Sequence, residues 1–151
     1  MLAEWIARMI GMTFQAAKGG FFDREKVKRS VDASTRRVFS KFGAFVRQRA
    51  KTSIRKRKGT SPPGSPPYSH VGLLRKFVLF AYESQRRSVV IGPTLTKEGS
   101  RAPRLLEHGG DAVIEDRGKK RHVRYRPRPF MQPALEAEKP KLPALWRDSV
   151  R

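Results

Sequence analysis

The sequence predicts an α+β fold, with a long N-terminal helix packed on a small antiparallel β-sheet and short C-terminal helices. An apolar stripe at helical spacing runs for roughly 30 residues after residue 22, which is the pattern of a long amphipathic helix. β-rich runs then occur in pairs around charged turns, at residues 77–82 with 88–91 and at residues 111–114 with 122–125. A length of 151 residues fits one domain with a single modest core, and we see no internal repeat.

The long helix is expected to begin after the N-cap Asp23 and to continue to about Arg57, which makes it the scaffold of the domain. A loop with four prolines and two glycines follows at residues 58–67. We interpret this loop as a stiff spacer, or as a contact with an identical neighbour, in preference to a ligand for an SH3-like groove. A short helical turn is expected at residues 72–75.

The second half of the chain predicts a helix at residues 102–108 that ends at Gly109-Gly110. Pro129 and Pro133 bracket Phe130, which we interpret as a core anchor that ties the sheet to the C-terminal helices. Glu136 and Glu138 would suit the positive end of the helix that starts there. Pro140 is expected to end that helix, and Pro143 to start a last one.

Charge is the most unusual property of the chain. It has 34 Lys and Arg against 13 Asp and Glu, a net charge of +21, and residues 33–82 contain no acid. Such a surface predicts a polyanion or an acidic partner. For the first basic cluster, which lies on the long helix, a solvated helix face is an equally good explanation; the second lies on a hairpin and could extend the same surface. Tyr125 is the one aromatic candidate for base stacking, so nothing supports sequence-specific reading. The first cluster comprises Arg47, Arg49, Lys51, Arg55, Lys56, Arg57 and Lys58, and the second Arg117, Lys119, Lys120, Arg121, Arg124, Arg126 and Arg128.

Residues 1–22 form an N-terminal amphipathic extension to the single α+β domain of residues 23–151. Glu4 and Arg8 interrupt its apolar run, so it does not fit a signal peptide. We expect a helix that packs on its own domain or on a neighbouring subunit in preference to a membrane, and no run is long enough to span one. The apolar residues at helical spacing are Leu2, Trp5, Ile6, Met9 and Ile10.

The inventory for catalysis is poor. The chain has no cysteine, and its three histidines are too far apart in sequence for metal-ligand spacing. Glu107-His108 is better explained as a helix C-terminus than as an acid–base pair, because adjacent helical residues point in different directions. Acids at residues 111–116 beside Lys119 and Lys120 fit a charged hairpin tip better than a nuclease metal site. We therefore expect no enzyme, no metal and no cofactor.

Several short segments in a fixed order resemble the tail-completion, or head–tail joining, family of long-tailed double-stranded DNA bacteriophages. The resemblance covers about residues 23–150 and departs from the family in the extension and in the high charge. The segments are SPPGSPP at residues 61–67, GLLR at 72–75, VVIGP at 89–93, LLEHG at 105–109, RPF at 128–130 and LPALWRDSV at 142–150.

The resemblance implies a structural protein of the virion neck, assembled in the host cytoplasm, that forms a closed ring, typically sixfold. Its partners would be the connector or adaptor, the tail-tube or tail-terminator protein, and the DNA that passes through the lumen. The basic clusters would face that DNA or an acidic partner. Candidate subunit contacts are Trp5, Ile6, Met9, Pro62, Pro63, Pro66 and Pro67.

Two other functions stay open. The charge alone also fits a non-specific nucleic-acid-binding protein. A small basic ribonuclease that uses Arg124 or Tyr125 in place of a metal is a third possibility.

Overall fold

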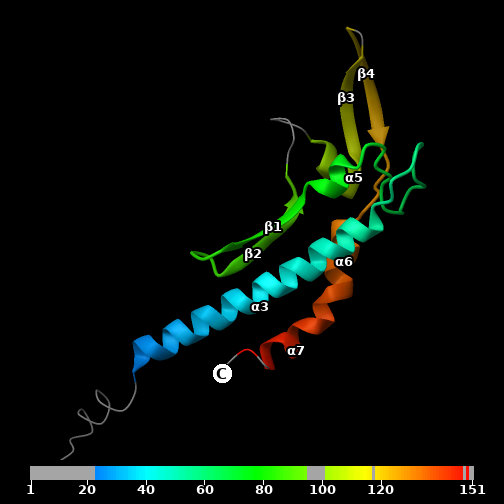
Figure 1. Cartoon of the computed structure of the whole chain (residues 1–151). Coiled ribbons are helices and arrows are strands. Elements are labelled where there is room, and N and C mark those ends of the chain that lie inside the picture. Colours follow the sequence, from blue (N-terminus) through cyan, green and yellow to red (C-terminus); the bar gives the residue numbers. More distant parts are fainter. Residues whose placement is uncertain (1–22, 95–100, 117, 148, 150–151) are drawn as a thin grey trace, which may run out of the picture.

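The computed structural model describes residues 23–94, 101–116, 118–147 and 149. It confirms the predicted class, with one long helix, antiparallel hairpins and short C-terminal helices (Figure 1). The elements are α3 (Arg24–Ser53), α4 (Leu73–Lys76), β1 (Val78–Glu83), β2 (Ser88–Pro93), α5 (Ala102–His108), β3 (Gly110–Asp116), β4 (Lys119–Tyr125), α6 (Met131–Glu138), the 3₁₀ turn η1 (Lys139–Lys141) and α7 (Leu142–Arg147).

α3 begins as predicted, because the Asp23 carboxylate accepts a hydrogen bond from the backbone N–H of Lys26 at 2.9 Å. It ends at Ser53, earlier than the predicted Arg57. Ile54 is extended, with a ψ of 106°, and its side chain is fully buried. Burying this side chain turns the chain out of the helix, so the basic residues 55–58 lie in a loop.

The β1–β2 hairpin packs on one side of α3 (Figure 1). Its register pairs Phe80 with Ile91 and Val78 with Pro93. Gly43 allows the close approach, since a Cβ built there would lie 2.8 Å from side-chain atoms of both Phe80 and Val89. At the turn of the hairpin, Arg87 pairs with Asp32 of α3 at 3.0 Å.

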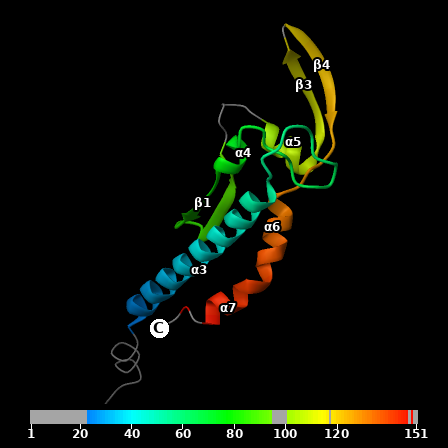
Figure 2. The ribbon, with the colours of Figure 1, turned by 45° about the vertical axis from the view of Figure 1, so that its right-hand side comes forward.

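α6, η1 and α7 run back along another side of α3 (Figures 1 and 2). Phe130 is 1% exposed, which confirms it as a core anchor. Near the end of the described chain, the Ser34 hydroxyl donates to the carbonyl of Ser149 at 2.9 Å. The core cluster consists of Phe42, Val46, Ala50, Ile54, Val78, Phe130 and Ala134.

The predicted single sheet is instead two separate hairpins. α5 and a pair of glycines with positive φ, Gly109 at 71° and Gly110 at 130°, lie between them and redirect the chain. β3 and β4 therefore project from one end of the molecule, as Figures 1 and 2 show. We call this hairpin the β3–β4 arm. Among the described elements, none packs extensively against it.

The Arg-Pro-Phe junction is held by α5. The Glu107 carboxylate accepts hydrogen bonds from the backbone N–H groups of Phe130, Met131 and Gln132, at 3.0, 3.1 and 2.8 Å. Glu107 thus caps α6, and the expectation that Glu136 and Glu138 occupy the positive end is wrong. Because α6 begins at Met131, those two residues lie in its second half, and Glu138 is its last residue.

Candidate functional site

The structure divides the first predicted basic cluster. The Arg47 Nε donates to the carbonyl of Val78 at 2.9 Å, which ties α3 to β1. Arg49 forms an ion pair with the buried carboxylate of Glu138. These two guanidinium groups thus hold the fold together. Lys51, further along α3, is half-buried.

The rest of that cluster lies in the loop after α3, and all of its side chains are exposed. The Arg57 guanidinium lies 5.6 Å from the centroid of the Tyr68 ring, a cation–π distance. The carbonyl of Arg55 accepts a hydrogen bond from the N–H of Ser69 at 2.9 Å. These contacts shape the loop and leave its charges in solvent, as a polyanion site requires. The exposed members are Arg55, Lys56, Arg57 and Lys58.

Acids stand opposite part of the second cluster. In the β3–β4 arm, Arg124 stands opposite Asp111, and Lys120 stands opposite Glu115. The backbone of Lys119 likewise pairs with that of Asp116, whereas Arg121 lies across from Ile114. Opposite charges at such positions attract across the ribbon. The arm therefore carries much less net charge than its basic strand alone implies; Arg117 lies outside the described residues.

A further basic surface was missed from the sequence, namely the most exposed side of α3. Most of its members are exposed, but Arg37 also donates to the carbonyl of Ser149 at 3.4 Å, and Ser40, Ala44 and Lys51 are half-buried. Its positions recur every three or four residues from Lys26 to Lys51 and include no acid. The stripe is roughly 38 Å long at about 1.5 Å per residue. The acid-free span in the sequence, arranged at helical spacing, was the available signal. We call this stripe the α3 outer face; its members are Lys26, Ser30, Ala33, Arg37, Ser40, Lys41, Ala44, Gln48 and Lys51.

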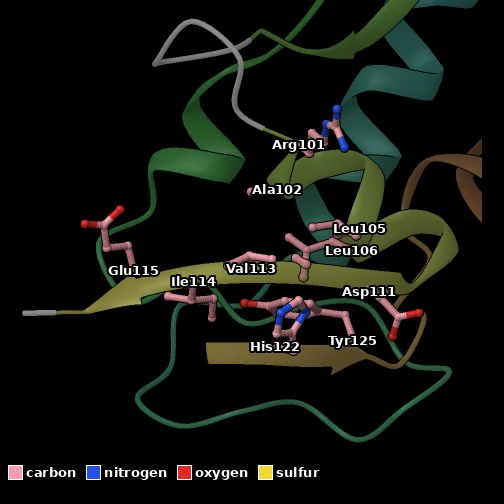
Figure 3. Close-up of a pocket in the computed structure, with 11 residues that line it drawn as sticks. Arg101, Ala102, Leu105, Leu106, Asp111, Val113, Ile114, Glu115, His122 and Tyr125 are labelled. Atoms are coloured by element: carbon pink, nitrogen blue, oxygen red, sulfur yellow. The ribbon is translucent and has the colours of Figure 1, made fainter. Parts of the chain in front are cut away.

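A cleft of about 920 Å³ lies between α5 and the β3–β4 arm (Figure 3). Its lining combines apolar side chains with a few charged ones, which suits the binding of apolar groups. The apolar part includes Ala102, Leu105, Leu106, Val113 and Ile114, and the polar part Arg101, Asp111, Glu115 and His122.

The Pro-rich loop folds back on its own chain. The N–H of Gly64 donates to the carbonyl of Pro127 at 2.9 Å, and the Arg128 Nε donates to the carbonyl of Ser61, also at 2.9 Å. Pro67, a predicted subunit contact, is buried in the single chain.

The other predicted subunit contacts differ in accessibility. Pro62 and Pro63 are exposed, and Pro66 is half-buried. Trp5, Ile6 and Met9 lie outside the described residues.

The described residues offer little for catalysis. Both oxygens of Glu107 are engaged by α6, so this carboxylate is not paired with His108. No group of three His, Asp or Glu suitable for a metal ion occurs in the part of the chain that the structure describes. Within the same residues, no helix has the length and apolar content needed to cross a bilayer.

Comparisons with family models, with curated proteins and with solved structures found no match.

Proposed function

We propose that the protein is a structural component of a phage neck, where copies form a closed ring between the connector and the tail tube and DNA passes through the lumen. The observation that carries this proposal is the α3 outer face, a long basic stripe without an acid. Its charge suits contact with the phosphates of a duplex at any sequence. The proposed location in the neck and the proposed ring come from the order of short segments, which resembles that of the tail-completion family.

The β1–β2 hairpin supports a subunit contact. On the side facing away from α3, Leu79 is 43% exposed and Val90 is 61% exposed. Ala81, the partner of Val90, is also exposed. An apolar patch on so highly charged a chain favours burial against another protein surface. A heterologous contact of this kind closes into a ring when the rotation between copies is suitable.

The test is the mass and shape of the assembled protein. We expect native mass spectrometry and negative-stain electron microscopy of the full chain to show a closed ring, of about six copies, with a central hole. A protein that stays monomeric at high concentration and at a salt concentration that screens its net charge of +21 would overturn the proposal.

The same α3 outer face favours a second candidate, a non-specific nucleic-acid-binding protein. That candidate predicts a monomer or small oligomer that binds duplex DNA with a steep salt dependence. A ring that joins purified heads to tails is expected only of a neck protein. The two functions are thus separated by assembly and not by DNA affinity.

A further inference from the structure

We infer that residues 1–22 of one copy bind as an amphipathic helix in the cleft between α5 and the β3–β4 arm of a second copy. This inference rests on the proposed ring and names the contact that would join its subunits. Residues 1–22 lie outside the described residues, but their sequence, their length and the point where they join α3 are known.

The cleft has the character of a helix-binding groove. Leu105 and Leu106 of α5 and Ile114 of β3 line it, and they are only half-buried in the isolated chain (Figure 3). Its volume of about 920 Å³ is enough for several side chains. An amphipathic helix binds such a groove through anchors at positions i, i+3, i+4 and i+7.

Residues 1–22 supply anchors at that spacing. Leu2, Trp5, Ile6 and Met9 stand at positions i, i+3, i+4 and i+7, and Ile10 extends the same stripe. The segment includes a tryptophan, a residue type that is enriched among the strongest contributors to protein interfaces.

Geometry favours a second copy as the owner of the cleft. Residues 1–22 join the N-terminal end of α3, whereas Figures 1 and 2 place α5 and the β3–β4 arm at its other end. α3 has 30 residues, which corresponds to roughly 45 Å at about 1.5 Å per residue. A helix of 22 residues reaches roughly 33 Å, so a helical segment falls short of the cleft in its own chain.

A donor at one end and an acceptor at the other define a head-to-tail contact. Each copy then offers one free segment and one free cleft until the chain of contacts closes. According to the rotation between copies, this arrangement closes as a reciprocally exchanged dimer or as a larger ring, or it continues as a filament.

The absence of cysteine from the chain allows a direct test. Thr13 continues the stripe at helical spacing from Met9, so a cysteine there keeps every apolar anchor. Full-length Thr13→Cys carrying a mass tag is co-expressed with untagged Leu105→Cys, or with Ala102→Cys at a second cleft position, and the assembly is oxidised. The matched control replaces Leu105→Cys by Ser84→Cys, an exposed and nearly isosteric change in the β1–β2 turn. Circular dichroism verifies that each variant is folded.

We expect the tagged–untagged disulfide dimer to form about tenfold more with either cleft variant than with Ser84→Cys, because docking raises the effective concentration of the two thiols. Equal yields would overturn the inference. So would a Thr13→Cys/Leu105→Cys double variant that forms its disulfide within one chain. If the wild type forms rings but the cleft variants give no more disulfide dimer than the control, the proposed docking is wrong while the proposed ring is retained. A monomeric wild type contradicts the proposed function itself.

Discussion

At the scale of single residues, Glu107 does the most to join distant segments. Its carboxylate accepts three backbone hydrogen bonds at the start of α6, where an anion also interacts favourably with the helix dipole. We expect Glu107→Ala to lower the free energy of unfolding by about 1–2 kcal/mol, the upper range for loss of a helix cap. Urea unfolding measures this change in the free energy of unfolding. Glu136→Ala, an exposed change in the same helix, is the control, and an equal loss in both variants would contradict the capping role.

Glu138 joins α6 to α3 by charge. Its side chain is 3% exposed and pairs with Arg49 and with Lys141, whose Nζ lies 2.5 Å from its Oε2. Hydrogen bonds from Lys141 and then Arg49 hold the pKa of the Glu138 carboxyl below its ordinary value of 4.5, although burial acts in the opposite direction. The carboxylate is therefore favoured more strongly in the folded protein than in the unfolded chain.

This lowered pKa predicts a dependence of stability on pH. The contribution of Glu138 is fully present above the ordinary value of 4.5 and is lost as the pH falls through the lower pKa of the folded state. We expect Glu138→Gln to lower the free energy of unfolding at pH 7 by about 1–2 kcal/mol, a modest loss because both basic partners are half-exposed. Urea unfolding at a series of pH values should then show a smaller loss below pH 4.5 for this variant than for the wild type. Parallel curves for the two proteins would exclude the mechanism.

At the scale of elements, the contact between α3 and the β1–β2 hairpin depends on Gly43. In a helix interior, alanine is usually more stabilising than glycine by about 1 kcal/mol. At this position, however, its Cβ would lie 2.8 Å from Phe80 and Val89. We expect Gly43→Ala to lower the free energy of unfolding by a net of about 1–3 kcal/mol, as overpacking does. Ser40→Ala, one turn away on the α3 outer face, should change it little. A stabilised Gly43→Ala protein would show that the hairpin moves freely on α3.

The elements also show what the sequence can predict. Local signals sufficed where the physical cause is local, as at the Asp23 cap and at the Gly109 end of α5. Long-range contacts had no such signal. Glu107 caps a helix more than 20 residues away, at Phe130. The arm register, which places acids opposite bases, likewise depends on how two strands align and not on either strand alone.

Removing positive charge should weaken DNA binding more on the α3 outer face than on the β3–β4 arm. We expect the triple change Lys26→Gln, Lys41→Gln and Lys51→Gln to weaken duplex binding and to reduce the salt slope by about 0.9 for each phosphate that the protein no longer neutralises. The triple change Lys119→Gln, Lys120→Gln and Arg124→Gln removes the same formal charge from the arm, where acids stand opposite. It should therefore have the smaller effect. Fluorescence anisotropy at several salt concentrations measures both, and the reverse order would place the DNA-binding surface on the arm.

At the scale of the whole molecule, the sequence predicted that the candidate site is basic but did not predict which surface carries it. The excess of positive charge and the acid-free span are properties of the sequence alone. Which charges remain available is decided by the fold, because Arg47 and Arg49 are engaged by Val78 and Glu138. Pro67 is likewise buried in the single chain. Composition therefore indicates the class of partner, whereas packing selects the surface.

Folding and assembly are expected to depend on different parts of the chain. Among the described residues, the buried side chains begin at Ser34, so residues 1–22 adjoin a part of α3 that contributes none. A chain of residues 23–151 should therefore keep its helical circular dichroism and its unfolding midpoint. It should nevertheless fail to form rings, because the apolar segment that joins copies is missing. Light scattering measures the mass, with full-length protein as the control. Rings of normal size from the truncated chain would show that other surfaces, such as the outer side of β1–β2, suffice for assembly.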